Sequence, residues 1–110
     1  MLSLPPSVRI FLCTQPTDMR HSFDGLAALT REVLKQDILS GHLFVIFNGR
    51  RDRTKILYWD RSGLALWAKR LECGVFTLPM AHEPSVVLSA AELALILEGL
   101  DLNRRTGSVS

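Results

Sequence analysis

A group of basic side chains lies in the middle of the sequence, around a short polar turn. Its members directly follow the Asn48-Gly49 pair and are Arg50, Arg51, Arg53 and Lys55. Guanidinium groups bind phosphate through two parallel hydrogen bonds, and an ammonium group binds it as a point charge. Two further cations, Lys69 and Arg70, come after a second turn. These six basic residues predict a surface that contacts the DNA backbone.

The charge of the chain is concentrated in the same region. Residues 42–74 carry seven basic and three acidic side chains, whereas the whole chain of 110 residues has a net charge of only +2. Such an asymmetry is compatible with a nucleic-acid face. It is equally compatible with a solvated hairpin whose charges keep the protein soluble.

Carboxylates give weaker support for a different chemistry, metal-dependent cleavage of nucleic acid. A metal nuclease needs two or three carboxylates that converge on its metal ions. The sequence leaves such a convergence open, but Asp24 and Glu92 are explained as residues of helix starts, and Asp52 and Asp60 as turn residues. We therefore expect no catalytic residue, no metal site and no cofactor.

Cysteines and histidines also lack the spacing of a known site. Cys13 and Cys73 fit neither a disulfide framework nor a metal pattern, and the three histidines are scattered. No apolar run approaches the ~20 residues of a membrane span, and Pro5-Pro6 stands where a signal peptide would be apolar. We expect a protein of the reducing cytoplasm, without membrane contact.

The segments on either side of the basic turn have the composition of β-strands. Three apolar runs rich in β-branched and aromatic residues, Leu43–Phe47, Ile56–Trp59 and Leu64–Ala68, are separated by two polar turns. They predict a three-stranded antiparallel meander. Alternation along the second run gives both faces apolar residues, so we expect both faces of the sheet to be covered.

The remaining elements complete one domain. Further extended segments are predicted over Ser7–Cys13, Val75–Leu78 and Val86–Leu88. One helix is predicted from an N-cap at Ser22 to about Gln36, and another over Ala90–Glu98, where Ser89 and Glu92 form a capping-box pattern and Gly99 ends the helix. The ends of the chain, Met1–Pro6 and Asn103–Ser110, are expected to be an extended arm and a frayed tail. The fold class is α+β: over residues 1–110, a small antiparallel meander sheet is packed with two α-helices.

Several motifs resemble one family of small proteins. They are T-D-M-R-H-S-F-D-G-L (Thr17–Leu26), K-I-L-Y-W-D (Lys55–Asp60), L-W-A-K-R-L-E (Leu66–Glu72) and L-x-L-I-L-E-G-L (Leu93–Leu100). Together, and in this order, they resemble the TnpB, or second-open-reading-frame, proteins of bacterial insertion sequences of the type numbered sixty-six. The family usually has a Trp-Pro pair where this chain has Leu78-Pro79, so no aromatic role is expected there.

The resemblance implies a protein that is encoded beside a transposase and helps transposition, with the transposase of the same element as its partner. It implies no catalytic residue. Combined with the basic turn, it leads to the hypothesis of a non-catalytic accessory protein that binds DNA. The alternatives are an interaction subunit that docks on the transposase through an apolar sheet face, and a metal-dependent nuclease. The sequence leaves open the DNA site, the step of transposition and the oligomeric state, a homo-oligomer included.

Overall fold

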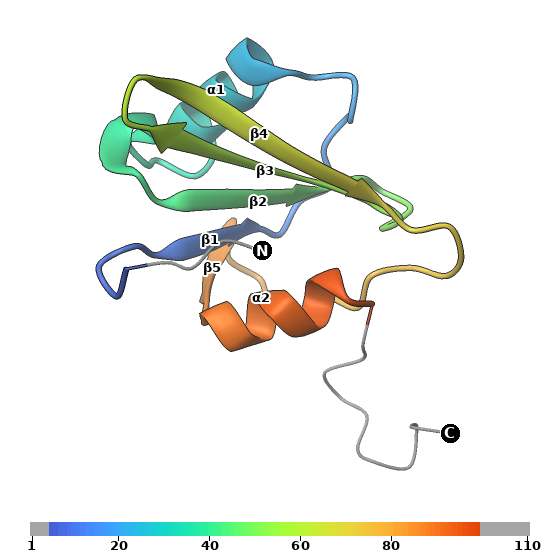
Figure 1. The fold of residues 1–110 in the computed structure, drawn as a ribbon. Helices are drawn as coiled ribbons and strands as arrows, with labels where there is room; N and C mark the ends of the chain where they lie inside the picture. The colour runs from blue at the N-terminus through green and yellow to red at the C-terminus, as the bar shows by residue number, and fades with distance from the viewer. Residues whose placement is uncertain (1–4, 100–110) are drawn as a thin grey trace.

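The fold is a five-stranded sheet with one helix on each face (Figure 1). A computed structural model describes residues 5–99, so most of the predicted arm and all of the predicted tail lie outside the described residues. The strands are β1 (Ile10–Cys13), β2 (Leu43–Phe47), β3 (Arg53–Asp60), β4 (Gly63–Arg70) and β5 (Ser85–Leu88). The helices are α1 (Phe23–Glu32), the short 3-10 helix η1 (Ile38–Ser40) and α2 (Ala90–Leu97).

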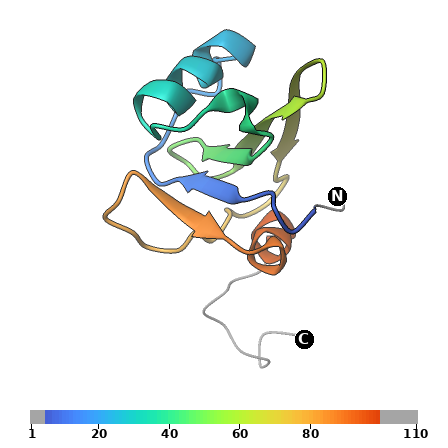
Figure 2. The same ribbon diagram turned by 90° about the vertical axis from the view of Figure 1, so that its left-hand side faces the viewer.

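The sheet has the strand order β4-β3-β2-β1-β5. The predicted meander is confirmed, because β2, β3 and β4 pair in antiparallel fashion, with Val45 beside Ile56 and Ile56 beside Trp67. One pair departs from the antiparallel pattern. β1 runs parallel to β2 and antiparallel to β5, so the sheet is mixed (Figure 2). The parallel pair arises because the chain crosses over through α1 between β1 and β2.

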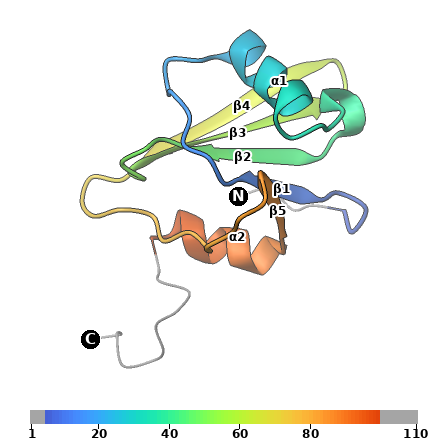
Figure 3. The same cartoon turned by 180° about the vertical axis from the view of Figure 1, so that it is seen from behind.

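Both faces of the sheet are buried, as the alternating apolar residues predict. The core on one face joins α1 to the strands through Leu26, Ala27, Phe44 and Leu57. The core on the other face joins α2 to the strands, and includes Leu12, Val45, Ile56 and Ile96. Figure 3 shows the two helices on opposite sides of the sheet. The faces of the central strands are therefore occupied by the chain's own helices.

The first helix ends earlier than predicted, at Glu32 rather than near Gln36. Lys35 adopts a left-handed backbone conformation with φ of 56°, which breaks the helical repeat. At the other end, the predicted cap Ser22 makes no side-chain capping bond. The helix also leaves the side chain of Phe23, its first residue, 43% exposed.

The segment Val75–Leu78 is not a strand, contrary to the prediction. Its central residue, Phe76, is fully buried, whereas Val75 is 55% exposed. The Phe76 N–H donates to the carbonyl of Arg51 at 2.7 Å. A single aromatic anchor, rather than a ladder of hydrogen bonds, thus holds this loop against the β2–β3 turn. Near the N-terminus, β1 begins at Ile10, three residues later than the predicted strand.

The start of α2 is capped as the sequence predicts. Ser89 Oγ accepts from the Glu92 N–H at 3.0 Å, and Glu92 Oε1 accepts from the Ser89 N–H at 2.8 Å. Gly99, with φ of 79°, follows the helix as predicted. Within residues 5–99, no helix has the length and apolar character needed to cross a membrane.

We expect Ser89→Ala to destabilise the protein by about 0.5–2 kcal/mol, because a helix N–H loses its acceptor. The denaturation midpoint in urea measures the change. Glu92→Gln is the control, since glutamine can keep the reciprocal bond to the Ser89 N–H. A midpoint that does not move in Ser89→Ala would contradict the capping role.

Candidate nucleic-acid interface

The turn between β2 and β3 is fixed by the side chain of Asn48. Its Oδ1 accepts from the N–H groups of Asp52 and Arg53 at 3.1 and 3.0 Å, and its Nδ2 donates to Asp52 Oδ1 at 2.6 Å. This last bond, more than the nearby charge of Arg50, lowers the pKa of Asp52. Arg51 adopts a left-handed conformation with φ of 60°. The arginines of the turn are thus carried on a well-defined backbone.

Two arginines face each other across the adjoining hairpin. β3 begins at Arg53, earlier than the predicted Ile56, and Arg53 lies directly opposite Arg70 of β4. Like charges in directly opposed positions destabilise a sheet. Arg70 has a long ion pair to Glu72 at 3.5 Å, in which both side chains are largely exposed. Arg53 forms no ion pair within the described residues.

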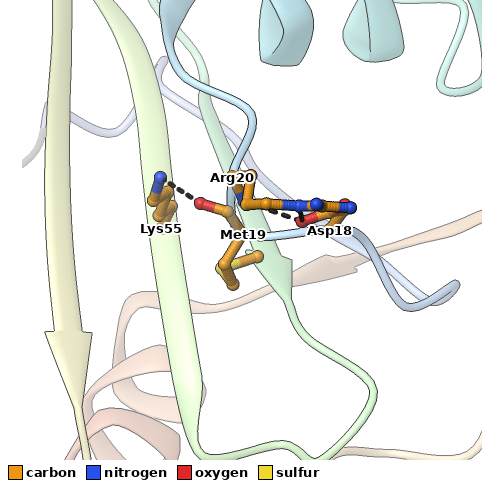
Figure 4. A network of polar contacts seen from close by, with 4 residues as sticks. All are labelled: Asp18, Met19, Arg20 and Lys55. Atoms are coloured by element: carbon orange, nitrogen blue, oxygen red, sulfur yellow. Dashed lines mark hydrogen bonds and ion pairs between the residues drawn. The ribbon is translucent and has the colours of Figure 1, made fainter.

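The loop between β1 and α1 lies near the basic turn, because it passes the β2–β3 end of the sheet (Figure 3). The Thr17 N–H donates to the Phe47 carbonyl at 2.9 Å. Lys55 Nζ donates to the carbonyl of Met19 at 2.7 Å (Figure 4). It also donates to the carbonyl of His21 at 2.8 Å. The ammonium group of Lys55, a predicted DNA contact, therefore ties this loop to β3.

Arg20 lies on this loop and was not among the predicted site residues. Its Nε donates to Asp18 Oδ1 and Oδ2 at 3.1 and 2.9 Å, and its Nη2 donates to Oδ2 at 2.6 Å (Figure 4). Asp18 Oδ1 also accepts from the Arg20 N–H at 2.8 Å. The side-chain bonds from Arg20 come first among the causes that lower the pKa of Asp18 to about 2. The sequence offered only the local Asp-x-Arg spacing, with no sign that this loop meets the hairpin.

We expect Arg20→Ala to raise the pKa of Asp18 from about 2 toward its ordinary value of 3.8, because the guanidinium no longer stabilises the carboxylate. The rise should be incomplete, since the backbone N–H of residue 20 remains as a donor. A carbon-13 NMR titration of the Asp18 carboxyl measures it. Because the pKa is lower in the folded state, ionised Asp18 favours folding above pH 3.8, and this contribution is lost as the pH falls toward 2. An unchanged pKa would contradict the ion pair.

These elements enclose two adjoining concavities. One, of about 520 Å³, is lined by residues that include Met19, Arg53, Lys55, Arg70 and Glu72. The other, of about 460 Å³, is lined by residues that include Asp18, Arg20, Arg50, Asp52 and Arg53. Met19 and Arg53 line both concavities. We call the combined surface, with its cations Arg20, Arg50, Arg53, Lys55, Lys69 and Arg70, the basic groove.

One of the six predicted residues, Arg51, lies apart from the basic groove. Arg51 lines a smaller cavity of about 80 Å³, beside Cys13 and Pro16. Lys69 lines the concavity of about 520 Å³, and its Nζ donates to the Leu97 carbonyl at 2.7 Å, where it satisfies the C-terminal end of α2. The structure thus brings together Arg50, Arg53, Lys55, Lys69 and Arg70.

Two aromatic side chains and the two cysteines lie elsewhere. Tyr58 and Trp67 pack against the core under α2, and neither lines the basic groove. Burial raises the pKa of the Cys13 thiol, whereas Cys73 is exposed. Among residues 5–99, no three histidine, cysteine or acidic side chains lie close enough together to hold a metal ion.

Comparison with known proteins gives one consistent result. Residues 8–107 match the family described as IS66 Orf2 like protein. The chain is 38% identical over 104 residues to the uncharacterized protein y4jC of Sinorhizobium fredii. This match covers 94% of this chain and 89% of y4jC. It is 40% identical over 102 residues to the uncharacterized protein y4hO of the same organism. This match covers 92% of this chain and 88% of y4hO. No solved structure matches the chain. The predicted family is confirmed: the chain belongs to the IS66 Orf2 like, or TnpB, family of transposition accessory proteins.

Proposed function

We propose that this protein is a non-catalytic accessory module that binds the DNA backbone during transposition, through the basic groove. The observation that carries the proposal is the opposed pair of Arg53 and Arg70, with Arg50 and Arg20 beside it on the same concave surface. An opposed pair of like charges costs the folded protein roughly 0.2–1 kcal/mol. A phosphate that lies between the two guanidinium groups would reverse this cost.

The acidic residues of the basic groove leave two of its arginines, Arg50 and Arg53, available for a ligand. Asp18 is engaged by Arg20, and Asp52 by the amide of Asn48. Glu72 is 84% exposed and lies 3.5 Å from Arg70, so its ion pair contributes little to stability. Arg50 and Arg53 form no ion pair within the described part of the chain.

The lining of the basic groove favours contact with phosphates over reading of bases. Its described residues contain no aromatic ring on which an unpaired base could stack. Contacts to phosphate fix the position of a protein on DNA but carry no sequence information. We therefore propose sequence-independent binding, with the transposase as the partner that selects the element ends, in the cytoplasm where the element resides.

The test is a salt titration of the purified protein with labelled duplex DNA, carried out on an element-end duplex and on an unrelated duplex of equal length. We expect the two affinities to agree within a few-fold. We also expect the logarithm of affinity to fall steeply with the logarithm of salt concentration, because bound phosphates release counterions. Binding that is absent, or that is insensitive to salt, would overturn the proposal.

A second candidate is that the basic groove binds an acidic segment of the transposase. The bidentate contact between Arg20 and Asp18 shows that a guanidinium of this surface can hold a carboxylate. Co-purification with the transposase before and after nuclease treatment separates the two candidates. Association that survives nuclease treatment and is lost in groove variants would favour the acidic segment.

A further inference from the structure

We infer that Arg20 is a further phosphate contact of the basic groove and that Asp18 is its positioning residue. The inference rests on the proposed function, and it concerns a loop about thirty residues away from the basic turn in the sequence. Arg20 is 91% exposed, and it lines the same concavity as Arg50 and Arg53. A phosphate bound by those two arginines therefore lies on the surface that Arg20 also borders.

The hydrogen bonds of Arg20 leave one edge of its guanidinium free for a ligand. A guanidinium group has five N–H donors. The Nε–H is shared between the two carboxylate oxygens of Asp18, and one Nη2–H bonds to Oδ2. Both hydrogens of Nη1 and the second hydrogen of Nη2 remain. These point along the outer edge of the plane, where a phosphate can accept two parallel bonds.

The loop that carries Arg20 is held rigidly against the sheet. The Thr17 N–H is bonded to Phe47, the last residue of β2. Lys55 Nζ holds the carbonyls of the two residues that flank Arg20, namely Met19 (Figure 4) and His21. Arg20 is therefore anchored to β2 and β3, the two strands that also carry the basic turn. A rigid frame lowers the entropic cost of placing its side chain on a ligand.

Asp18 restricts the orientation of the Arg20 side chain, and it also places one negative charge in the basic groove. An exposed arginine samples many rotamers, and the fork with Asp18 selects one of them. Asp18 Oδ1 also closes a local turn by accepting from the Arg20 N–H. The two bonds act together, so that the free edge of the guanidinium is presented in one direction.

The first arm of the test compares Arg20→Ala with Arg31→Ala in the salt titration with labelled duplex DNA. Arg31 is an exposed arginine of α1 that does not line the basic groove, so its removal matches the change in net charge. We expect Arg20→Ala to flatten the slope of log affinity against log salt by about 0.9, so that a fourfold rise in salt costs the variant about 3.5-fold less affinity than the parent. Arg31→Ala should leave the slope unchanged, and both variants should remain folded under the conditions of the titration.

The second arm uses Asp18→Asn, in which the amide oxygen can still close the turn. Simple electrostatics predicts tighter binding, because a negative charge is removed. Positioning by Asp18 predicts the opposite, a several-fold loss of affinity in a variant that remains folded. Tighter binding would overturn the positioning role of Asp18, and equal slopes for Arg20→Ala and Arg31→Ala would overturn the contact. In both cases steep salt dependence of the parent would leave the proposed function standing, whereas a parent that does not bind DNA overturns both.

Discussion

Phe76→Ala is expected to destabilise the protein by about 3–5 kcal/mol, the usual cost of deleting a buried aromatic ring. The Phe76 side chain is fully buried and packs edge-on against Phe47, with ring centroids 5.2 Å apart. Because domains of this kind are stable by only about 5–15 kcal/mol in total, the loss is a large share of the whole. The midpoint and slope of urea denaturation measure it.

Val75→Ala is the matched control for this prediction. Val75 precedes Phe76 in the same loop but is 55% exposed, so its truncation should change stability by no more than about 0.5 kcal/mol. Equal effects of the two substitutions would show that Phe76 is not an anchor. We also expect the folded fraction of Phe76→Ala to bind DNA more weakly. The buried ring positions the backbone N–H of residue 76, which holds the carbonyl of Arg51 in the basic turn.

The parts of the fold that the sequence predicted are those with strong local signals. The run Leu43–Phe47 contains only apolar residues and became the fully buried β2 with the same bounds. The spacing of Ser89 and Glu92 lets each side chain accept from the backbone N–H of the other residue, without help from distant parts of the chain. Their capping box is present. Such features depend on neighbours within a few residues, and a single sequence contains those neighbours.

The features that the sequence did not predict depend on distant contacts or on strained backbone. Lys35, three residues beyond the end of α1, adopts a left-handed conformation, for which glycine is the usual signal and lysine is not. Val75–Leu78 has strand composition, but the Phe76 N–H found a partner in the basic turn instead of a sheet neighbour. The pairing of β1 parallel to β2 joins segments separated by a whole helix, and no local pattern specifies it.

The candidate site was predicted in part for the same reason. Arg53 and Arg70 were identified by charge, but their direct opposition depends on the register of the hairpin. Lys55 and Lys69 were identified in the same way, and the structure engages both ammonium groups with backbone carbonyls. Arg20 could not be connected with the hairpin, because the crossover through α1 brings its loop to the end of the sheet.

The largest effect on binding is expected from the triple variant Arg50→Ala, Arg53→Ala, Arg70→Ala. With four arginines of the basic groove on phosphates, the parent should show a slope of log affinity against log salt of roughly −3 to −4. Removal of three contacts should flatten the slope to about −1. Over a fourfold range of salt this difference amounts to about a 40-fold change in relative affinity. The variant should remain folded, because the three side chains are exposed and Arg53 and Arg70 repel each other in the parent.

The control for net charge is the triple variant Arg9→Ala, Arg31→Ala, Arg61→Gly. It removes the same charge from exposed positions that do not line the basic groove, and glycine suits the φ of 56° at position 61. If attraction to DNA depends on overall charge alone, the two variants will lose affinity equally. If the groove variant is folded and binds DNA as well as the parent does, the groove is not the DNA contact. Loss of transposase binding in that same variant would then identify these arginines as a site for the partner's carboxylates, because a guanidinium fork fits a carboxylate as well as a phosphate.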